Sequence, residues 1–460
     1  MKTPDAFNLI LKIENSVDTS LFTWNSFNTW PLIRKIIWFK LISSSPTTSI
    51  IQKDNSLNIW SGIKEIISLP IKKLKRNKIK QDSVKIFFSR PEYLQEISSS
   101  KFIDRIVDPI IDLSSSNEKM TKYYLYKISK EKKLIYEFFY MNQETVFDVL
   151  NVGANQEIEL DKIAVLLKID RAELKLVYIK ELREFLGWYY SAKSLLSQHK
   201  KLKEIYVTCW YLPDMMGICA AASELGIRTI DIQHGKQGKY QAMYSGWTNI
   251  PSNGYDLMPE KFWCWGKPSC NHILDSSPNR TKHIPFVGGY PWINYYLKNI
   301  AQKKSTSINE RIRVLLTMQP PQGDNHERIP NFIIKFLKSK YTESVHFIFR
   351  LHPNDTEGKY YCNERLKLIN PNSYTIDEGK KNLYDLFGEV THHITAFSSC
   401  CYEAQLFNLP TLLYGNDSKK IYQDEIKEKI FSWTDSNLHD LLSWLHNDRA
   451  SNHKMTYRYI

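Results

Sequence analysis

The chain has 460 residues, of which 42% are hydrophobic, 24% are charged and 13% are aromatic, and its formal net charge is +13. The length predicts two or three domains, each with its own core, and the composition is that of a globular protein. The positive charge indicates an anionic partner, which the charge alone leaves open between nucleic acid, an anionic membrane surface and phosphorylated substrates.

The seven cysteines form no CxxC pair and no Cys/His set with zinc spacing, so the sequence predicts neither a disulfide framework nor a metal site. Acidic residues interrupt the amino terminus where a signal peptide would be basic, and no apolar run approaches the roughly 18 residues that span a bilayer. These features predict a reduced, cytoplasmic protein that is neither secreted nor integral to a membrane.

Residues 1–80 form the first predicted segment, and they mix aromatic and basic side chains on probable helices. The side chains concerned are Trp24, Phe27, Trp30, Trp38 and Phe39, with Arg34, Lys35, Lys40 and the stretch "IKKLKRNKIK" at 71–80. This mixture suits the interface of an anionic membrane, where rings lie among headgroups and basic residues attract anionic lipids. The alternative is an amphipathic helix packed on the main domain, followed by a solvated basic linker, and the pattern does not decide between the two.

Residues 81–300 show the alternation of strands and helices that is typical of α/β proteins. "VKIFFS" predicts a strand, 117–205 is mostly helical and charged, and "KEIYVTCWY" predicts a second strand. "MMGICAAASELG" is a helix of small residues with a glycine stop, and "IRTIDIQHGKQG" is a strand that runs into a glycine-rich loop.

The alternation restarts after a polar linker at 297–311. The predicted order is "IRVLLTM", a helix near 329–340, "VHFIFRL", a helix near 360–369, "SYTID", a helix near 381–388, "HHITAF", a helix at 400–407 and "PTLLYG". Repeated strand–helix–strand units form right-handed crossovers and a parallel sheet. The predicted fold is therefore α/β, with Rossmann-like domains at 81–300 and 301–460 whose parallel sheets face each other across a cleft, plus the helical segment 1–80.

The first candidate site is "DIQHGKQG", Asp231 to Gly238. A strand through Ile230 and Ile232 places Gln233 and His234 at its carboxyl edge, where open α/β sheets bind ligands. An imidazole there could take a proton from an acceptor hydroxyl, because its unperturbed pKa lies near neutrality. The alternative is that His234 caps or braces the turn.

The second candidate site follows "VHFIFRLHPND". Pro353 ends the apolar run, so we expect His352 at the carboxyl edge of a buried strand, where its imidazole could bind a nucleotide phosphate. Arg350 projects to the same side because residues two apart in a strand share a face. For an HP dipeptide alone, a turn histidine bonded to the backbone is the alternative.

The third candidate site is "ITAFSSCCYEAQLFNLP". A strand ends at Phe397, Ser398 and Ser399 open a helix, and Glu403 lies one turn into it. Hydroxyls and free amides at a helix start can bind phosphate, and Glu403 could accept from ribose hydroxyls. Plain N-capping by Ser399 is the alternative. No glycine-rich dinucleotide fingerprint and no Walker loop occurs, so we expect no cofactor.

In this order "QHG", "VGGYPWIN", "RLHP", "FSSCCYEA" and "LPTLLYG" resemble the GT-B glycosyltransferases of bacterial surface polysaccharide synthesis, which make capsule, O-antigen and teichoic acid. The pattern is similar to that of CDP-glycerol glycerophosphotransferases and of the capsule sialic acid and Kdo transferases. The resemblance covers roughly residues 204–415 and is strongest in the carboxyl-terminal block.

The resemblance implies that His352, Ser398 and Ser399 bind the donor's phosphate, with Arg350 beside them, and that Glu403 contacts the ribose. The acidic pair with glycine that precedes HP in the sialyltransferases is out of order here, because "IDEG" follows it at Asp377, Glu378 and Gly379. Its role as a base therefore does not transfer.

On the acceptor side the resemblance implies that His234 is the base, with Asp231 as the other candidate and with Gln233 and Gly235 beside them.

The expected function is an inverting, metal-independent glycosyltransferase that moves a sugar from a nucleotide-sugar donor to a lipid-linked surface glycan. A CMP-sugar is favoured and a UDP-sugar remains open. The alternatives are a glycerol-phosphate or polyol-phosphate transferase of the same fold and a nucleotide-sugar 2-epimerase. A nucleic-acid-binding protein is disfavoured because no DNA- or RNA-binding motif is visible. The expected location is the cytoplasm, peripheral on the inner face of the bacterial cytoplasmic membrane.

Overall fold

The chain folds into two compact units that divide at Ile42 and between Ile300 and Ala301. The computed structural model describes residues 3–43, 82–98, 101–114, 118–129, 132–134, 136–146, 152–235, 237–275, 277, 280–299, 312–319, 327–352, 355–379 and 381–447. The basic stretch 71–80 and the linker 300–311 lie outside these residues.

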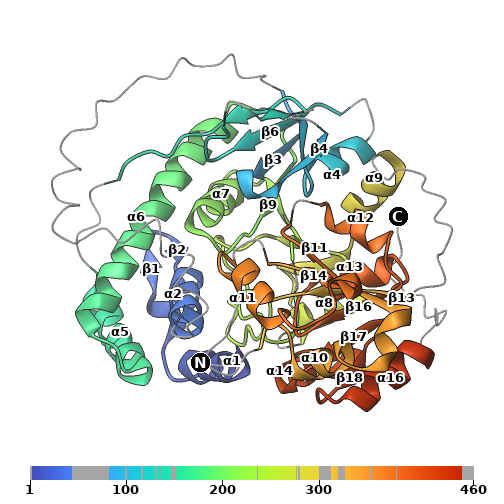
Figure 1. Ribbon diagram of the computed structural model, residues 1–460. Helices are drawn as coiled ribbons and strands as arrows, with labels where there is room; N and C mark the ends of the chain where they lie inside the picture. Colours follow the sequence, from blue (N-terminus) through green and yellow to red (C-terminus); the bar gives the residue numbers. More distant parts are fainter. Residues whose placement is uncertain are drawn as a thin grey trace. The chain divides into compact units, whose positions relative to one another are not determined.

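The first unit is built on a seven-stranded parallel sheet (Figure 1). In spatial order its strands are β12 (Ile284–Val287), β11 (Lys261–Cys264), β10 (Arg228–Ile232), β9 (Glu204–Thr208), β3 (Lys85–Ser89), β6 (Met120–Tyr124) and β8 (Phe139–Tyr140). Its longer helices are α5 (Ala154–Leu167), α6 (Arg171–Leu196), α7 (Pro213–Glu224), α8 (Lys267–Leu274) and α9 (Pro291–Asn299), with the shorter α4 at Asp108–Leu113. A small sheet of β4 (Leu94–Ser98), β5 (Lys101–Asp104) and β7 (Lys133–Leu134) completes the unit.

Two glycine positions allow close packing in this unit. A Cβ on Gly217 of α7 would lie 2.6 Å from the carbonyl oxygen of Phe185 on α6, so only glycine lets the two helices approach this closely. In the "VGGYP" stretch, a Cβ on Gly288 would lie 2.1 Å from the indole of Trp263. Glycine is needed there because the indole of β11 packs directly on the chain that follows β12.

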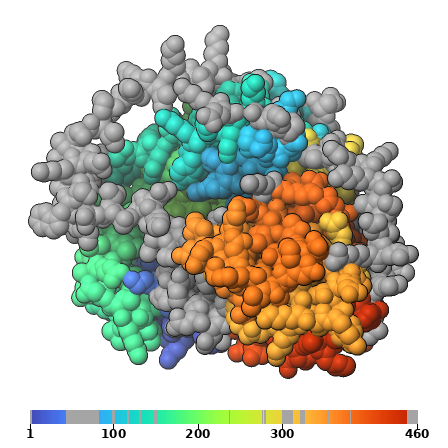
Figure 2. All heavy atoms as spheres, in the orientation of Figure 1, coloured from blue at the N-terminus to red at the C-terminus, as the bar shows by residue number. Residues whose placement is uncertain are grey.

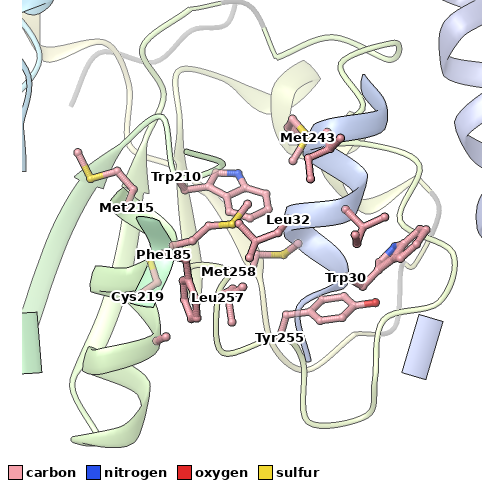
Figure 3. Close-up of a cluster of buried hydrophobic side chains, with 14 of the residues drawn as sticks. Trp30, Leu32, Phe185, Trp210, Met215, Cys219, Met243, Tyr255, Leu257 and Met258 are labelled. Carbon is pink, nitrogen blue, oxygen red and sulfur yellow. The ribbon is translucent and has the colours of Figure 1, made fainter. Parts of the chain in front are cut away.

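The amino-terminal helices are part of the core of the first unit. Figure 3 shows Trp30 and Leu32 of α2 (Trp30–Ser43) among side chains of α6, α7 and the 243–258 segment. Phe27, Trp30 and Trp38 are 6%, 0% and 5% exposed. The prediction that these rings lie among lipid headgroups is therefore wrong, and the alternative of a helix packed on the main domain describes them correctly.

The basic residues of α2 are paired within the protein. Arg34 is fully buried, forms an ion pair with Glu14 of α1 (Thr3–Glu14), and lies with its guanidinium carbon 4.3 Å from the Trp247 ring centroid. The Lys35 ammonium lies 2.6 Å from the Glu181 carboxylate. These charges are therefore neutralised by partners that lie far away in the sequence.

The second unit is built on a six-stranded parallel sheet. In spatial order its strands are β15 (Tyr374–Asp377), β14 (Val345–Arg350), β13 (Ile312–Thr317), β16 (His392–Thr395), β17 (Thr411–Tyr414) and β18 (Ser432–Thr434). Its helices are α10 (Asn331–Leu337), α11 (Gly358–Arg365), α12 (Leu383–Phe387), α13 (Cys400–Leu406), α14 (Asn416–Ile421), α15 (Gln423–Lys427) and α16 (Leu438–Asn447). The atoms of this unit are coloured orange to red in Figure 2.

The predicted fold class of α/β with two parallel sheets is confirmed. In the second unit the strand order reverses at β13, which pairs with β14 on one side and with β16 on the other. Such a switch point opens a crevice outside the carboxyl ends of the strands, which is where ligands bind in open α/β sheets. Among the helices of the described residues, none combines the length and the apolar character needed to cross a bilayer.

Candidate functional site

The carboxyl edge of the first unit's sheet carries His234, two residues after β10. Its imidazole lies between aromatic rings, with ring centroids 5.8 Å from Tyr93 and 6.3 Å from Tyr211. Burial lowers the pKa of His234 to about 4, and the charges of Arg105 and Arg90 act in the same direction. The imidazole is therefore neutral at pH 7 and can accept a proton, although only weakly.

Asp231 lies inside β10 and not at its edge. The side chain is fully buried, and its two carboxylate oxygens accept hydrogen bonds from the Trp210 backbone N–H (3.2 Å) and the Tyr244 hydroxyl (2.9 Å). Burial raises its pKa to about 8. Asp231 is out of contact with solvent in this structure, and its role as the base remains a prediction.

Gln233 braces the loop that carries His234. Its side-chain oxygen accepts from the Trp265 backbone N–H (2.7 Å), and its side-chain nitrogen donates to the Gly235 carbonyl (2.9 Å). Gln233 is only 2% exposed, and its contact with an acceptor remains a prediction. A Cβ on Gly235 would meet no atom within 4 Å, so the described neighbours impose no steric need for glycine there.

The same edge carries a charged cluster that the sequence did not reveal. Arg90 directly follows β3 and forms an ion pair with Asp214 at the start of α7. The Tyr126 hydroxyl donates to the same carboxylate (2.9 Å), and the Arg90 guanidinium carbon lies 4.6 Å from the Tyr126 ring centroid. Arg90 and Asp214 are 124 positions apart, so the sequence gives no sign that they pair. The one local signal for a site here was an arginine directly after a buried strand.

Cys209 joins β9 to α7 in a strained backbone conformation. Its φ of 60° lies in the left-handed region that residues other than glycine rarely adopt. Such strain is concentrated at functional sites. Burial raises the pKa of the Cys209 thiol to about 12, so the thiol is not a nucleophile here.

In the second unit, Arg350 and Asp377 lie opposite each other on β14 and β15 and form an ion pair. Arg350 Nη1 also donates to the Lys381 carbonyl (2.7 Å). The Arg350 guanidinium is thus held by the neighbouring strand, and its contact with phosphate remains a prediction. Asp377 ends β15 within this ion pair.

His352 lies two residues beyond β14, as Pro353 predicts, and its own carbonyl accepts from the Asp355 backbone N–H (2.9 Å). The side chain is half-buried, and burial lowers its pKa. A neutral imidazole is a hydrogen-bond donor at one ring nitrogen and an acceptor at the other. It could therefore donate to a phosphate oxygen.

Ser398 and Ser399 lie between β16 and α13, both partly exposed. Ser398 Oγ accepts from the Cys400 backbone N–H (3.3 Å), whereas Ser399 occupies the N-cap position without a side-chain capping bond. The alternative of plain capping by Ser399 is therefore not what the structure has. The Tyr422 hydroxyl lies 3.0 Å from the Phe397 carbonyl and 3.1 Å from the Ser398 carbonyl, and it holds this turn in place.

Glu403 is only 9% exposed, and one of its carboxylate oxygens accepts from the Tyr384 hydroxyl (2.5 Å). Its contact with a ribose remains a prediction. Each sheet therefore brings its own predicted residues to its carboxyl edge: Gln233, His234 and Gly235 in the first unit, and Arg350, His352, Ser398 and Ser399 in the second. The expectation that the two edges face each other across a cleft remains a prediction.

No family model and no curated protein matches this sequence. Solved structures of similar fold include the S. aureus MnaA–UDP co-structure, with 13% identity and a TM-score of 0.47 over 81% of this chain and 92% of that chain. The Neisseria meningitidis UDP-GlcNAc 2-epimerase bound to UDP-GlcNAc has 16% identity and a TM-score of 0.44, covering 79% and 90%. Arabidopsis thaliana UGT89C1 complexed with UDP-L-rhamnose has 11% identity and a TM-score of 0.43, covering 80% and 90%. These likenesses are too distant to carry a function to this chain.

Proposed function

We propose that this chain is a nucleotide-sugar enzyme, an inverting glycosyltransferase that moves a sugar from a nucleotide-activated donor to a hydroxyl of a lipid-linked surface glycan. One observation carries the proposal. In both parallel sheets, side chains suited to this chemistry emerge at the carboxyl edge: His234 in the first unit, and His352, Ser398 and Ser399 in the second.

The residues of the second unit suit the leaving phosphate of the donor. Charge builds on that phosphate as the glycosidic bond breaks, so hydrogen-bond donors placed around it lower the barrier. Ser399 has a hydroxyl without a capping bond, and His352 offers a neutral imidazole N–H. The Tyr422 phenol keeps the serine turn in position for this contact.

His234 is the base of the proposed reaction, since Asp231 is out of contact with solvent. Its low pKa of about 4 has two physical causes, burial and the nearby charges of Arg105 and Arg90. A bound anionic donor would offset those positive charges and raise the pKa towards neutrality. His234 would then become a competent base only when the donor is present, which would limit wasteful proton transfer in its absence.

A nucleotide-sugar 2-epimerase is the second candidate, and Asp214 favours it. Epimerisation needs groups that remove and return a proton, and a carboxylate at the carboxyl edge can do this. Asp214 lies at that edge in contact with Arg90 and the Tyr126 hydroxyl. Because Asp214 is 1% exposed, the epimerase reading requires this ion pair to open when substrate binds.

One assay separates the two candidates. The full chain is incubated with CMP- and UDP-sugars, with and without a lipid-linked glycan acceptor, and the products are separated by mass and by anomeric configuration. A transferase releases nucleotide in proportion to the glycan that it extends, with inversion, whereas an epimerase converts the nucleotide sugar without any acceptor. Replacing His234 with alanine should abolish transfer, and replacing the exposed His439 should not. Transfer that survives His234→Ala would remove this residue as the base.

An anionic membrane surface is the proposed partner through the basic stretch 71–80, since the rings of α2 are buried. Replacing Lys72, Lys73, Lys75 and Arg76 with glutamine should reduce the fraction of protein that sediments with anionic liposomes. Each basic residue near an anionic surface contributes about 1 kcal/mol to membrane binding. The fraction that sediments with neutral liposomes should not change. Unchanged sedimentation would refute the membrane contact.

A further inference from the structure

A pocket of about 370 Å³ opens at the carboxyl edge of the second unit's sheet. It lies where β16, β17 and β18 end and where α10 begins. The residues that line it include Glu327, Asn331, Phe397, Tyr414, Asn416 and Ser436. Phe397 directly precedes Ser398, so the pocket adjoins the turn to which the proposed function assigns the donor's phosphate.

Tyr414 gives this pocket an unsatisfied hydrogen-bonding group. Its side chain is 5% exposed, and its ring packs edge-on against Phe332 with centroids 5.9 Å apart. Its hydroxyl is buried and has no hydrogen-bond partner among the described residues. A buried polar group without a partner destabilises the free protein, so a ligand that bonds to this hydroxyl gains a matching advantage.

The charge of the lining decides which ligand fits. Glu327 and Asp417 contribute carboxylates, and none of the lining residues that the structure describes is a lysine, arginine or histidine. Glu327 is held by the side-chain and backbone nitrogens of Asn331 (2.7 and 2.8 Å) and by Arg365 (3.3 Å), so its negative charge is fixed in place. Arg365 is bonded to Glu327 and Asn331 and is not among the lining residues. Within the described lining, a phosphate or carboxylate would therefore meet two carboxylates and no cation, so both are disfavoured.

The geometry points to a pocket for an uncharged, polyhydroxylated sugar ring, which donates its hydroxyls to the carboxylate and amide oxygens and accepts from the Tyr414 hydroxyl. The aromatic side chains of Phe397 and Tyr414 supply apolar surface for the faces of the ring. This inference deepens the proposed function, on which it rests for the source of the sugar. It selects a donor with a neutral sugar over one with an acidic sugar, such as CMP-sialic acid.

The test compares two buried tyrosines of the same unit. Tyr414→Phe removes a hydroxyl without a partner, so the variant should melt at the wild-type temperature or above it. Tyr422→Phe removes bonds to two carbonyl groups and should melt at a lower temperature. Binding is then measured by calorimetry with UDP, UDP-N-acetylglucosamine, CMP, CMP-sialic acid and free methyl glycosides.

We expect Tyr414→Phe to weaken UDP-N-acetylglucosamine roughly tenfold and to leave UDP unchanged, as one lost hydrogen bond predicts. Equal affinity of variant and wild type for the nucleotide sugar would overturn the inference, as would tighter binding of CMP-sialic acid than of CMP. If nucleotides do not bind, but methyl glycosides bind and Tyr414→Phe weakens their binding, the proposed function is refuted and the assignment of the sugar pocket is supported.

A second variant is expected to fold normally and tests the charge argument by adding a positive charge to the pocket. Asn416 is exposed at the start of α14, so Asn416→Lys should fold normally and place a cation at the pocket. The expected result is a gain in affinity for CMP-sialic acid relative to UDP-N-acetylglucosamine. No change in this preference would contradict the assignment of the sugar to the pocket.

Discussion

The carboxyl edges of the two sheets differ in how far their polar side chains are already bonded to the protein. In the first unit, Arg90, Asp214 and Tyr126 bind one another, and Asp231 has a partner at each oxygen. In the second unit, Ser399 makes no capping bond, and the Tyr414 hydroxyl lacks a partner in the described part of the chain. Arg90, Asp214 and Tyr126 at the first edge are thus bonded to one another, whereas Ser399 and Tyr414 at the second edge keep hydroxyls that a ligand could bond.

This difference predicts which substitutions affect the stability of the protein and which affect its function. Removing one member of a mutually bonded set leaves its partners buried without compensation, so the main loss is in folding. Removing a group whose bonds are completed by a ligand costs little in the free protein and much in the complex. Substitutions at Arg90 or Asp214 should therefore lower the free energy of unfolding, and those at Ser399 or Tyr414 should lower binding or turnover.

The largest expected effect is at Arg90. Replacing it with alanine leaves the Asp214 carboxylate, which is 1% exposed, without its cation. We expect the free energy of unfolding to fall by about 3–5 kcal/mol, measured by urea titration.

Lys40→Ala is the control for this change, because Lys40 pairs with Glu173 at 40% and 52% exposure and should lose at most about 1 kcal/mol. A loss at Arg90 no larger than at Lys40 would contradict the description of the first edge as a bonded set.

The next effect is at His352 and is expected in turnover. His352→Ala should reduce kcat about 100- to 1000-fold, equivalent to about 2.7–4 kcal/mol, if the imidazole contacts the leaving phosphate. The unfolding midpoint should stay near that of the wild type. His346 is the control, because it lies on the same strand, bonded to Thr375 and Asn372. Near-normal turnover of His352→Ala would remove this residue from the mechanism.

Much of the second unit could be predicted from the sequence because its signals are local. Apolar runs ended by proline, serine or glycine mark β14, β16 and β17, and the positions of the predicted helices match α10 to α13. The same local reasoning placed His352 just past the end of β14. A parallel sheet follows from the alternation of these elements, without any knowledge of long-range contacts.

The errors arose where the deciding contacts are remote in sequence. An aromatic and basic helix has the same pattern whether it lies on lipid or in a core, and α2 is buried because Glu14 and Glu181 neutralise its charges. Arg90 and Asp214 are joined only by folding. Asp231 is a different case, since its place inside β10, between Ile230 and Ile232, already indicated burial.

The third effect is a pH dependence of the free energy of unfolding, which tests the protonation state of Asp231 in the first unit. Burial raises the pKa of Asp231 to about 8, above the value near 3.8 of the unfolded chain. Between pH 3.8 and pH 8, Asp231 is therefore protonated in the folded state and ionised in the unfolded state. The stability that Asp231 contributes is fully present below pH 3.8 and is lost as the pH rises towards 8.

Asp231→Asn keeps the shape and removes the titration. The difference in free energy of unfolding between wild type and this variant should fall by about 1.4 kcal/mol between pH 6 and pH 7. A difference that stays constant from pH 5 to pH 8 would show that Asp231 is ionised in the folded protein.

The smallest expected effect is at Ser399, and it sharpens the comparison most directly. Because its hydroxyl makes no capping bond, Ser399→Ala should change the free energy of unfolding by less than about 0.5 kcal/mol. Ser398→Ala removes the acceptor for the Cys400 backbone N–H and should cost about 1 kcal/mol, the ordinary value for such a bond. Both should weaken binding of the nucleotide, measured by calorimetry with CMP and UDP. If Ser399→Ala destabilises the protein as much as Ser398→Ala does, the Ser399 hydroxyl is bonded within the protein. It is then not available to a ligand, contrary to the comparison of the two edges.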